Sequence, residues 1–320
     1  MYDIAFVILN YNLYNEVLQC VSSIEENIDT ANYFVVVVDN ASPNAVGSKL
    51  LKHYRSNNHV EVMINKENIG FAQGNNVGID YIKNIKDGAK YICCLNNDVI
   101  LEQRNIYETI NRIFEYDSSI SVIGPRIFNK YYEEIIQEEN LRTISEYEQL
   151  IESHEKELSR IEKERIILSD NPWKKRLLEN KYIYDINFVR RNLEKKIKQN
   201  INRNRNKKEY YIRLRDSYNR EDINGKYDVI LHGCCLFFTP AFFKYKKGFN
   251  ESTFMYGEEP ILFYEVIRTH NHTFRTDELN VIHIENRSTD SRFDPEEGRR
   301  FKLKNEMDSM RILIKILSDK

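Results

Sequence analysis

The stretch that decides the fold is IAFVILNYN at residues 4–12, an apolar run that ends in three polar residues. Three more runs rich in apolar and β-branched residues follow at Phe34–Val38, Val60–Ile64 and Tyr91–Leu95. Runs of this length and composition are typical of strands that are buried on both faces of a sheet. We therefore predict that they form the core of one sheet.

Segments with helical spacing separate these runs. Apolar residues recur every three or four positions, first at Val17, Val21, Ile24 and Ile28, then at Val77, Tyr81 and Ile85, and then at Ile106, Ile110 and Phe114. Alternating strands and helices imply crossover connections and a parallel arrangement. The sequence thus predicts an α/β fold with a mostly parallel central sheet flanked by helices.

Polar residues follow each predicted strand. They are Asn10-Tyr11-Asn12, Asp39-Asn40-Ala41-Ser42, the segment 65–68, and Asn96-Asn97-Asp98. Ligands of such sheets bind beyond the carboxyl ends of the strands. A carboxylate such as Asp98 can hold Mg²⁺ or Mn²⁺ there, since both ions prefer oxygen ligands. An isolated Asn-Asn-Asp triplet is more often a turn, and its place in the alternating pattern is what favours a site.

Three further segments are candidates for the site. The sequence NIGFAQGNN at residues 68–76 opens a helix, and its backbone amides are expected to face a phosphate. Glu258 and Glu259 stand before Pro260 at a helix start, where a carboxylate caps the helix or acts as a general base. His283 ends a short apolar run, where a lone histidine is usually structural or exposed.

Charged residues dominate between residues 131 and 225. Ile144, Tyr147, Ile151, His154, Leu158, Ile161, Arg165 and Leu168 keep a three–four spacing, which indicates a heptad seam. A second helical pattern follows the Asp170-Asn171-Pro172 break. The first arm is rich in Glu and the second in Lys and Arg, so we predict an inserted antiparallel helical hairpin, a coiled coil. The catalytic domain would then comprise residues 1–130 and 226–320.

Composition narrows the class of protein. The net charge of −2 over 320 residues favours neither nucleic acid nor a membrane as a partner. The five cysteines lack CxxC spacing, which predicts buried free thiols in a reducing compartment. No signal peptide and no apolar run long enough to cross a bilayer is visible. We expect a cytoplasmic protein, with the inner face of the membrane as an alternative place.

Seven motifs in order resemble one family. They are VILNYN (7–12), VVVVDNAS (35–42), NIGFAQGNNVGI (68–79), LNNDV (95–99), HGCCLFF (232–238), GFNESTFMYGEE (248–259) and VIHIENRS (281–288). Together they look like the inverting family 2 glycosyltransferases, and most of all their rhamnosyltransferase-like subgroup. This resemblance covers nearly all of the chain except the charged insert. It implies a GT-A fold and a nucleotide-sugar donor.

The resemblance also implies roles for single residues. Asp39 would contact the nucleotide base, and the donor would lie near Asn10, Tyr11, Asn68, Asn76, Asn96 and Asn97. Asp98 and His283 would hold a divalent metal, Mg²⁺ or Mn²⁺, on the diphosphate. Glu259 occupies the position of the family's usual base aspartate, and Glu258 is the alternative. Asn stands at 96 and 97, so the metal motif offers one carboxylate.

Two other functions remain open at this stage. A metal-dependent nucleotidyltransferase can share such a sheet, but it would usually show a basic, Gly-rich stretch after the first strand, where this chain has Asn10-Tyr11-Asn12. A non-catalytic scaffold would present the hairpin to a partner. The expected acceptor is a glycan or lipid-linked glycan of surface polysaccharide synthesis, by resemblance. The hairpin would mediate the formation of a homodimer or a peripheral contact with a membrane.

Overall fold

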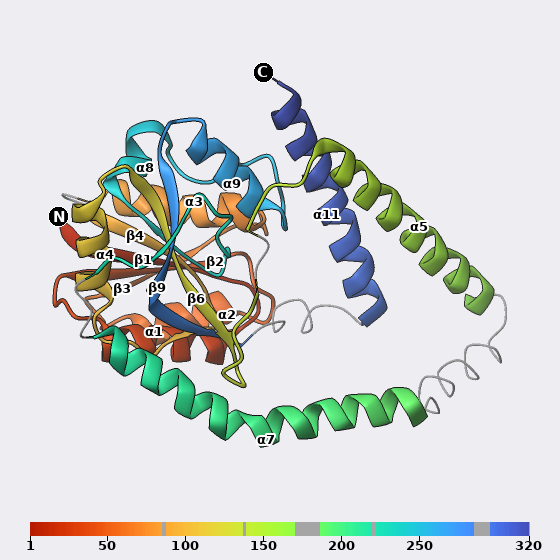
Figure 1. Cartoon of the computed structure of the whole chain (residues 1–320), viewed down its shortest axis with the longest axis horizontal. Helices are drawn as coiled ribbons and strands as arrows, with labels where there is room; N and C mark the ends of the chain where they lie inside the picture. The colour runs from red at the N-terminus through yellow and green to blue at the C-terminus, as the bar shows by residue number, and fades with distance from the viewer. Residues whose placement is uncertain (85–87, 137–138, 170–185, 219–221, 285–294, 320) are drawn as a thin grey trace.

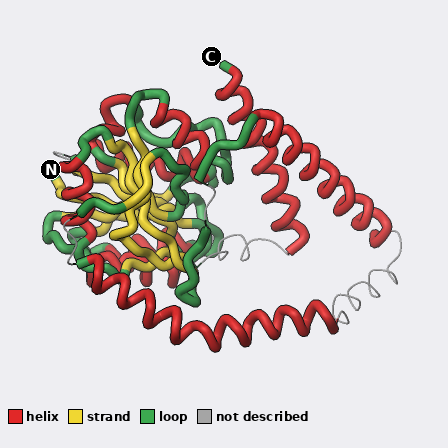
Figure 2. Tube along the Cα trace, viewed as in Figure 1, coloured by secondary structure: helices red, strands yellow, loops and turns green. Residues whose placement is uncertain are grey.

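A mixed sheet of nine strands forms the centre of the molecule, with helices on both of its faces (Figures 1 and 2). The computed structural model describes the chain except for residues 85–87, 137–138, 170–185, 219–221, 285–294 and 320. Asp170-Asn171-Pro172, Ile85 and the end of the VIHIENRS motif lie outside the described residues.

The N-terminal half of the sheet is parallel. Its strands lie in the order β3 (Val60–Ile64), β2 (Tyr33–Asp39), β1 (Tyr2–Asn10) and β4 (Ala89–Asn96). All three pairings between them are parallel, and the register sets Asn10 beside Asp39 and Leu9 beside Asn96. The four predicted runs are therefore neighbouring strands whose carboxyl ends meet at one edge.

The second half of the sheet is mixed. Beyond β4 follow β8 (Cys235–Phe238), β6 (Ile120–Asn129), β9 (His272–His283) and β5 (Val99–Leu101), and β7 (Gly225–Tyr227) pairs with β9. Of these pairings only that of β6 with β9 is parallel. Strands β5, β6 and β7 were not predicted, because two of them span three residues and the polar residues of β6 obscure its pattern.

Each face of the sheet has its own hydrophobic core. Helices α1 (Tyr14–Asn27), α2 (Val46–Tyr54) and α4 (Ile106–Tyr116) cover one face, and α3 (Phe71–Asn84), α8 (Pro240–Tyr245) and α9 (Glu258–Ile267) cover the other. Side chains alternate along β4, so Cys93 and Leu95 lie in the first core and Ile92 and Cys94 in the second.

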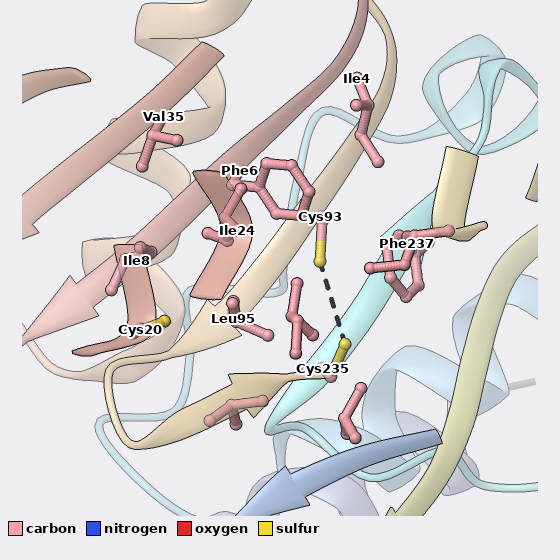
Figure 3. Close-up of a cluster of buried hydrophobic side chains, with 14 of the residues drawn as sticks. Ile4, Phe6, Ile8, Cys20, Ile24, Val35, Cys93, Leu95, Cys235 and Phe237 are labelled. Carbon is pink, nitrogen blue, oxygen red and sulfur yellow. Dashed lines mark hydrogen bonds between the residues drawn. The ribbon is translucent and has the colours of Figure 1, made fainter. Parts of the chain in front are cut away.

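The cysteines lie inside these cores. All five are buried and none forms a disulfide, which confirms the prediction of buried free thiols. Figure 3 shows Cys93 and Cys235 side by side among Ile4, Phe6, Leu95 and Phe237, with their Sγ atoms 4.0 Å apart. Burial raises the pKa of the Cys20, Cys93 and Cys94 thiols well above its ordinary value, so they pack as small apolar groups.

Two long helices lie where the hairpin was predicted, α5 (Ile144–Ser169) and α7 (Ile186–Ser217). The heptad seam of α5 packs against the C-terminal helix α11 (Pro295–Ser318), and the described end of α7 packs against β9 (Figure 1). Ion pairs of Arg311 with Glu155 and of Arg299 with Glu157 match α5 to α11. The partner of the seam is therefore α11, because α11 offers both an apolar face and the opposite charge.

No helix within the described residues is both long enough and apolar enough to span a bilayer. Helices α5 and α7 have the length, but charged residues recur throughout both.

The close contact of α3 with the sheet gives a test of this packing. A Cβ at Gly78 would lie 2.4 Å from Val7 Cγ1 and 3.1 Å from Val38 Cγ2. We expect Gly78→Ala to push α3 away from β1 and to lower the free energy of unfolding by about 1–3 kcal/mol, despite the better helix propensity of alanine. Urea unfolding measures this, with Asp80→Ala on the exposed side of α3 as the control. A stabilised Gly78→Ala protein would contradict the packing.

Candidate active site

A buried polar network joins the ends of β1, β2 and β4. Asn10 is at its centre, because its Nδ2 donates to Asp39 Oδ1 at 2.8 Å and its Oδ1 accepts from Asn97 Nδ2 at 2.7 Å. Ser42 donates to Asp39 through both its backbone N–H and its hydroxyl. Asp39 is only 1% exposed. These residues thus fix the edge of the sheet. Contact of Asp39 with the nucleotide base stays a prediction.

A second network surrounds Asn40, which sequence reasoning did not single out. Its Nδ2 donates to Asn68 Oδ1 and to the Gly70 carbonyl, and its Oδ1 accepts from Asn65 Nδ2 and from the Ile69 N–H. Asn40 therefore holds the loop between β3 and α3, and Asn68 belongs to that scaffold. The sequence signal that could have identified Asn40 is its position among the polar residues that follow the predicted strand Phe34–Val38.

Three amides at the start of α3 are paired within the protein, and phosphate contact by the rest of its first turn stays a prediction. The Ile69 N–H donates to Asn40, the Gly70 N–H to Asn68 Oδ1 and the Phe71 N–H to the Phe254 carbonyl. Gly70 has φ +86°, and a Cβ there would lie 2.2 Å from the Phe254 oxygen. This glycine permits close approach of another backbone segment instead of a ligand.

Asn76 also connects α3 to the loop that precedes α9. Its Nδ2 donates to the Phe249 carbonyl and to Glu251 Oε1, and its Oδ1 accepts from the Phe249 N–H. All of the side-chain amide is thus engaged with the loop at residues 249–251. Together with the contact between Phe71 and Phe254, this positions the loop that leads into Glu258 and Glu259.

Asp98 and His283 lie together at the same edge. Asp98 follows β4, and His283 ends β9, with Val99 of β5 paired opposite it. Asp98 Oδ1 is 3.2 Å from His283 Nε2, and both side chains are nearly buried. His283 Nδ1 is buried and has no hydrogen-bond partner among the residues that the structure describes. The predicted pair of metal ligands is therefore brought together by two strands far apart in the sequence.

Residues 232–234 join this pair to the glutamates. The Cys234 carbonyl accepts from the Asn96 N–H at 2.9 Å, and the His232 ring meets the His283 ring edge-on at 5.4 Å. The Gly233 N–H donates to Glu259 Oε1 at 3.2 Å. A Cβ at Gly233 would lie 2.6 Å from that oxygen, so glycine lets the carboxylate approach.

The two glutamates differ in surroundings. Glu258 is 5% exposed, and its Oε1 is buried without a partner, whereas Glu259 is partly exposed. Burial, together with the charge of Glu259, raises the pKa of Glu258 to about 8. Burial also raises the pKa of Glu259 above its ordinary value. Only Glu259 thus combines access with a carboxylate of increased basicity.

The N-terminal half of the chain, which carries the strand ends up to Asp98, matches a known family. Residues 5–172, just over half of the 320-residue chain, match the family model described as "Glycosyl transferase family 2". The chain belongs to this family. A search of curated proteins gave no match.

Solved structures of glycosyltransferases resemble this family 2 chain in fold. GalNAc-T7 with UDP, GalNAc and Mn²⁺ superposes over 95% of this chain and 47% of its own length, with 12% identity and a TM-score of 0.53. S. aureus TarS 1–349 with UDP-GlcNAc covers 43% of this chain and 38% of that protein, with 16% identity and a TM-score of 0.36. The chain spans less than half of either structure. The mixed sheet flanked by helices is the GT-A fold.

His232 was missing from the predicted site of this family 2 chain. The motif HGCCLFF contributed only to the resemblance, but β8 begins at Cys235, and His232 before it lies against His283. Burial and the neighbouring His283 lower the pKa of His232 to about 4, against the opposite effect of Asp98. Tyr11 and Asn96 also lie at this edge, both partly exposed.

The raised pKa of Glu258 predicts a pH effect on stability. The unfolded chain releases this proton near the ordinary pKa of 4.5, and the folded chain releases it near 8. The stability contributed by the protonated form is therefore lost as pH rises between these values. Glu258→Gln cannot ionise, so we expect its stability relative to wild type to increase by about 1–3 kcal/mol from pH 5 to pH 8.

Urea unfolding of both proteins at the two pH values measures this difference. The exposed Glu61→Gln on β3 is the matched control and should show no such change. A stability difference between Glu258→Gln and wild type that is the same at both pH values would contradict a protonated Glu258.

Proposed function

We propose that this chain is an inverting glycosyltransferase that moves a sugar from a nucleotide diphosphate donor to an acceptor hydroxyl. One observation carries the proposal: residues 232–234 link the Asp98–His283 pair to Glu259 through the contacts with Asn96, His283 and Glu259 Oε1. A site for the diphosphate thus lies next to a base. Family membership and the GT-A fold support the same reaction class.

The residues at this edge fit a divalent metal ion. Two ligands at right angles on an ion with bonds of about 2.1 Å lie about 3 Å apart, close to the 3.2 Å between Asp98 and His283. With Nε2 as the ligand, a neutral His283 carries its proton on Nδ1, which has no hydrogen-bond partner among the described residues. Asp98 and His283 would hold Mg²⁺ or Mn²⁺, which would offset the charge of the diphosphate.

Glu259 would act as the general base. Its carboxylate takes the proton of the acceptor hydroxyl as the oxygen attacks the anomeric carbon, and the bond from that carbon to the diphosphate breaks. Attack from the face opposite the leaving group inverts the anomeric centre. Buried Glu258 keeps its proton at neutral pH and so remains a neutral neighbour of Glu259.

The donor would lie along the ends of β1, β2 and β4. Tyr11 and Asn96 are partly exposed there and would contact it directly. Asn10, Asp39, Asn68, Asn76 and Asn97 would act mainly by holding the edge in shape. The sugar class, a hexose or deoxyhexose, and a role in polysaccharide synthesis remain part of the proposal.

The insert at residues 131–225 would serve an acceptor or a partner. The described end of α7 exposes Arg203, Arg205, Lys208, Arg213 and Arg215 beside Ile201, Tyr211 and Ile212. Basic and apolar residues on one helix suit a second copy or an anionic membrane surface. This role, the division into a catalytic domain and an insert, and the cytoplasmic location are proposals.

Binding of the donor should depend on a metal and on Asp98. We expect Asp98→Ala to abolish the increase in affinity that Mn²⁺ gives to a nucleoside diphosphate, because it removes the only carboxylate of the pair. Calorimetry with UDP, GDP and dTDP, with and without Mn²⁺, measures this. Asp308→Ala on α11, with its side chain 71% exposed, is the control. Unchanged metal dependence in Asp98→Ala would exclude this site.

Turnover should depend on Glu259. We expect Glu259→Gln to lower the rate of sugar transfer about 10²–10⁴-fold with little effect on donor binding, because glutamine keeps the Gly233 contact but cannot take a proton. A panel of nucleotide sugars is first screened to find the donor. NMR of the first-formed product then gives its anomeric configuration. Wild-type turnover in Glu259→Gln and loss in Glu258→Gln would reverse the roles. A retained anomer would exclude single displacement, and nucleotidyl transfer would favour the alternative enzyme class.

A further inference from the structure

His232 stands between the two halves of the proposed site. It precedes β8, its ring is edge-on to His283 at 5.4 Å, and the next residue donates to Glu259. His232 is partly exposed, whereas residues 231 and 233–239 are buried. It is therefore a polar group that a ligand at this edge can reach.

A backbone hydrogen bond fixes which ring nitrogen carries the proton. The Cys234 N–H donates to His232 Nδ1 at 3.1 Å, so Nδ1 must present a lone pair. A neutral imidazole has one N–H, and that proton is then on Nε2. Among the described residues, Nε2 has no hydrogen-bond partner. His232 is thus held as an N–H donor that points its proton away from its own backbone.

This arrangement argues against His232 as a metal ligand. Donor atoms of His232, Cys234 and His283 lie within 4.8 Å of one another, a spacing that suggests a metal site. A metal ligand must offer a lone pair, but Nδ1 already accepts a hydrogen bond and Nε2 carries the proton. The metal chemistry therefore belongs to Asp98 and His283, and His232 has a different role beside them.

We propose that His232 Nε2–H donates a hydrogen bond to an oxygen of the diphosphate that departs from the sugar, an inference that rests on the proposed function. When the bond from the anomeric carbon to the phosphate oxygen breaks, its electron pair stays on that oxygen. The His232 N–H stabilises the added charge and keeps its proton, because the Cys234 N–H blocks Nδ1 from taking another. His232 binds the leaving group and transfers no proton.

The tautomer is tested first, in the free protein. Nitrogen-15 NMR of ¹⁵N-histidine-labelled protein separates protonated from unprotonated ring nitrogens, and His232→Gln identifies the signals. We expect Nε2 to be protonated and Nδ1 unprotonated at neutral pH. A proton on Nδ1 overturns the proposal without any reference to activity.

Binding is tested with inorganic pyrophosphate, UDP and GDP in the presence of Mg²⁺. Glutamine places an amide N–H near the position of Nε2, so we expect His232→Gln to bind within about threefold of wild type. Without the donor, His232→Ala should bind about 10- to 100-fold more weakly, as for a hydrogen bond to a charged group. His272→Ala is the matched control, because His272 begins the strand that His283 ends, about 36 Å away at 3.3 Å per residue.

The outcomes separate this inference from the proposed function. Wild-type protein that binds none of the three probes contradicts the proposed function. Wild-type binding that His232→Ala leaves unchanged contradicts the role of His232 alone. Equal weakening in His232→Ala and His232→Gln, with melting temperatures kept, also contradicts it, because the donor is present in the second variant. Rescue by glutamine supports it.

Discussion

The structure depends on one constraint, the need to satisfy polar groups at the buried ends of parallel strands. Strands β1, β2 and β4 are covered on both faces, so Asn10, Asp39 and Asn97 end in an apolar environment. An unpaired amide there would cost about 2–7 kcal/mol, and an unpaired ionised carboxylate would cost more. Hydrogen bonds between the three side chains avoid this cost, and they make the edge of the sheet rigid.

That rigidity reaches the second half of the chain through backbone contacts. Asn40 fixes the loop before α3, and α3 holds the loop at residues 249–254 through Asn76 and the Phe71 N–H. This loop delivers Glu258 and Glu259 to the site. Helix α11 supports the same turn from outside, since Ser309 packs against Gly257 and Phe301 against Phe254. Helix α5 packs against α11 in turn, so a charged helix outside the sheet core supports the turn that precedes Glu258 and Glu259.

The sequence predicted the parallel half of the fold, because a long run such as Ile4–Leu9 admits only a buried strand. It failed where the information is not local. Whether the three-residue β5 is a strand depends on its pairing with β9, and the partner of the α5 seam is a helix more than 120 residues away along the chain. The Asp98–His283 pair was predicted from resemblance, since no spacing rule links two residues on different strands. The backbone amides of residues 68–76 were expected to face a phosphate, but those of residues 69–71 donate to protein acceptors that the sequence could not indicate.

A glycine can mark a close approach without naming the group that approaches. Gly70 makes room for the Phe254 backbone and Gly233 for the Glu259 carboxylate, although both appear in motifs with similar small residues. The difference has a physical cause. The amides at residues 69–71 donate to Asn40, Asn68 and Phe254, which belong to the scaffold. Residues 232–234 instead contact Asn96, His283 and Glu259, which lie on three separate elements at the proposed site. The backbone N–H groups at this site engage particular side-chain acceptors. Those hydrogen bonds determine which side chains keep a donor or a lone pair for a substrate.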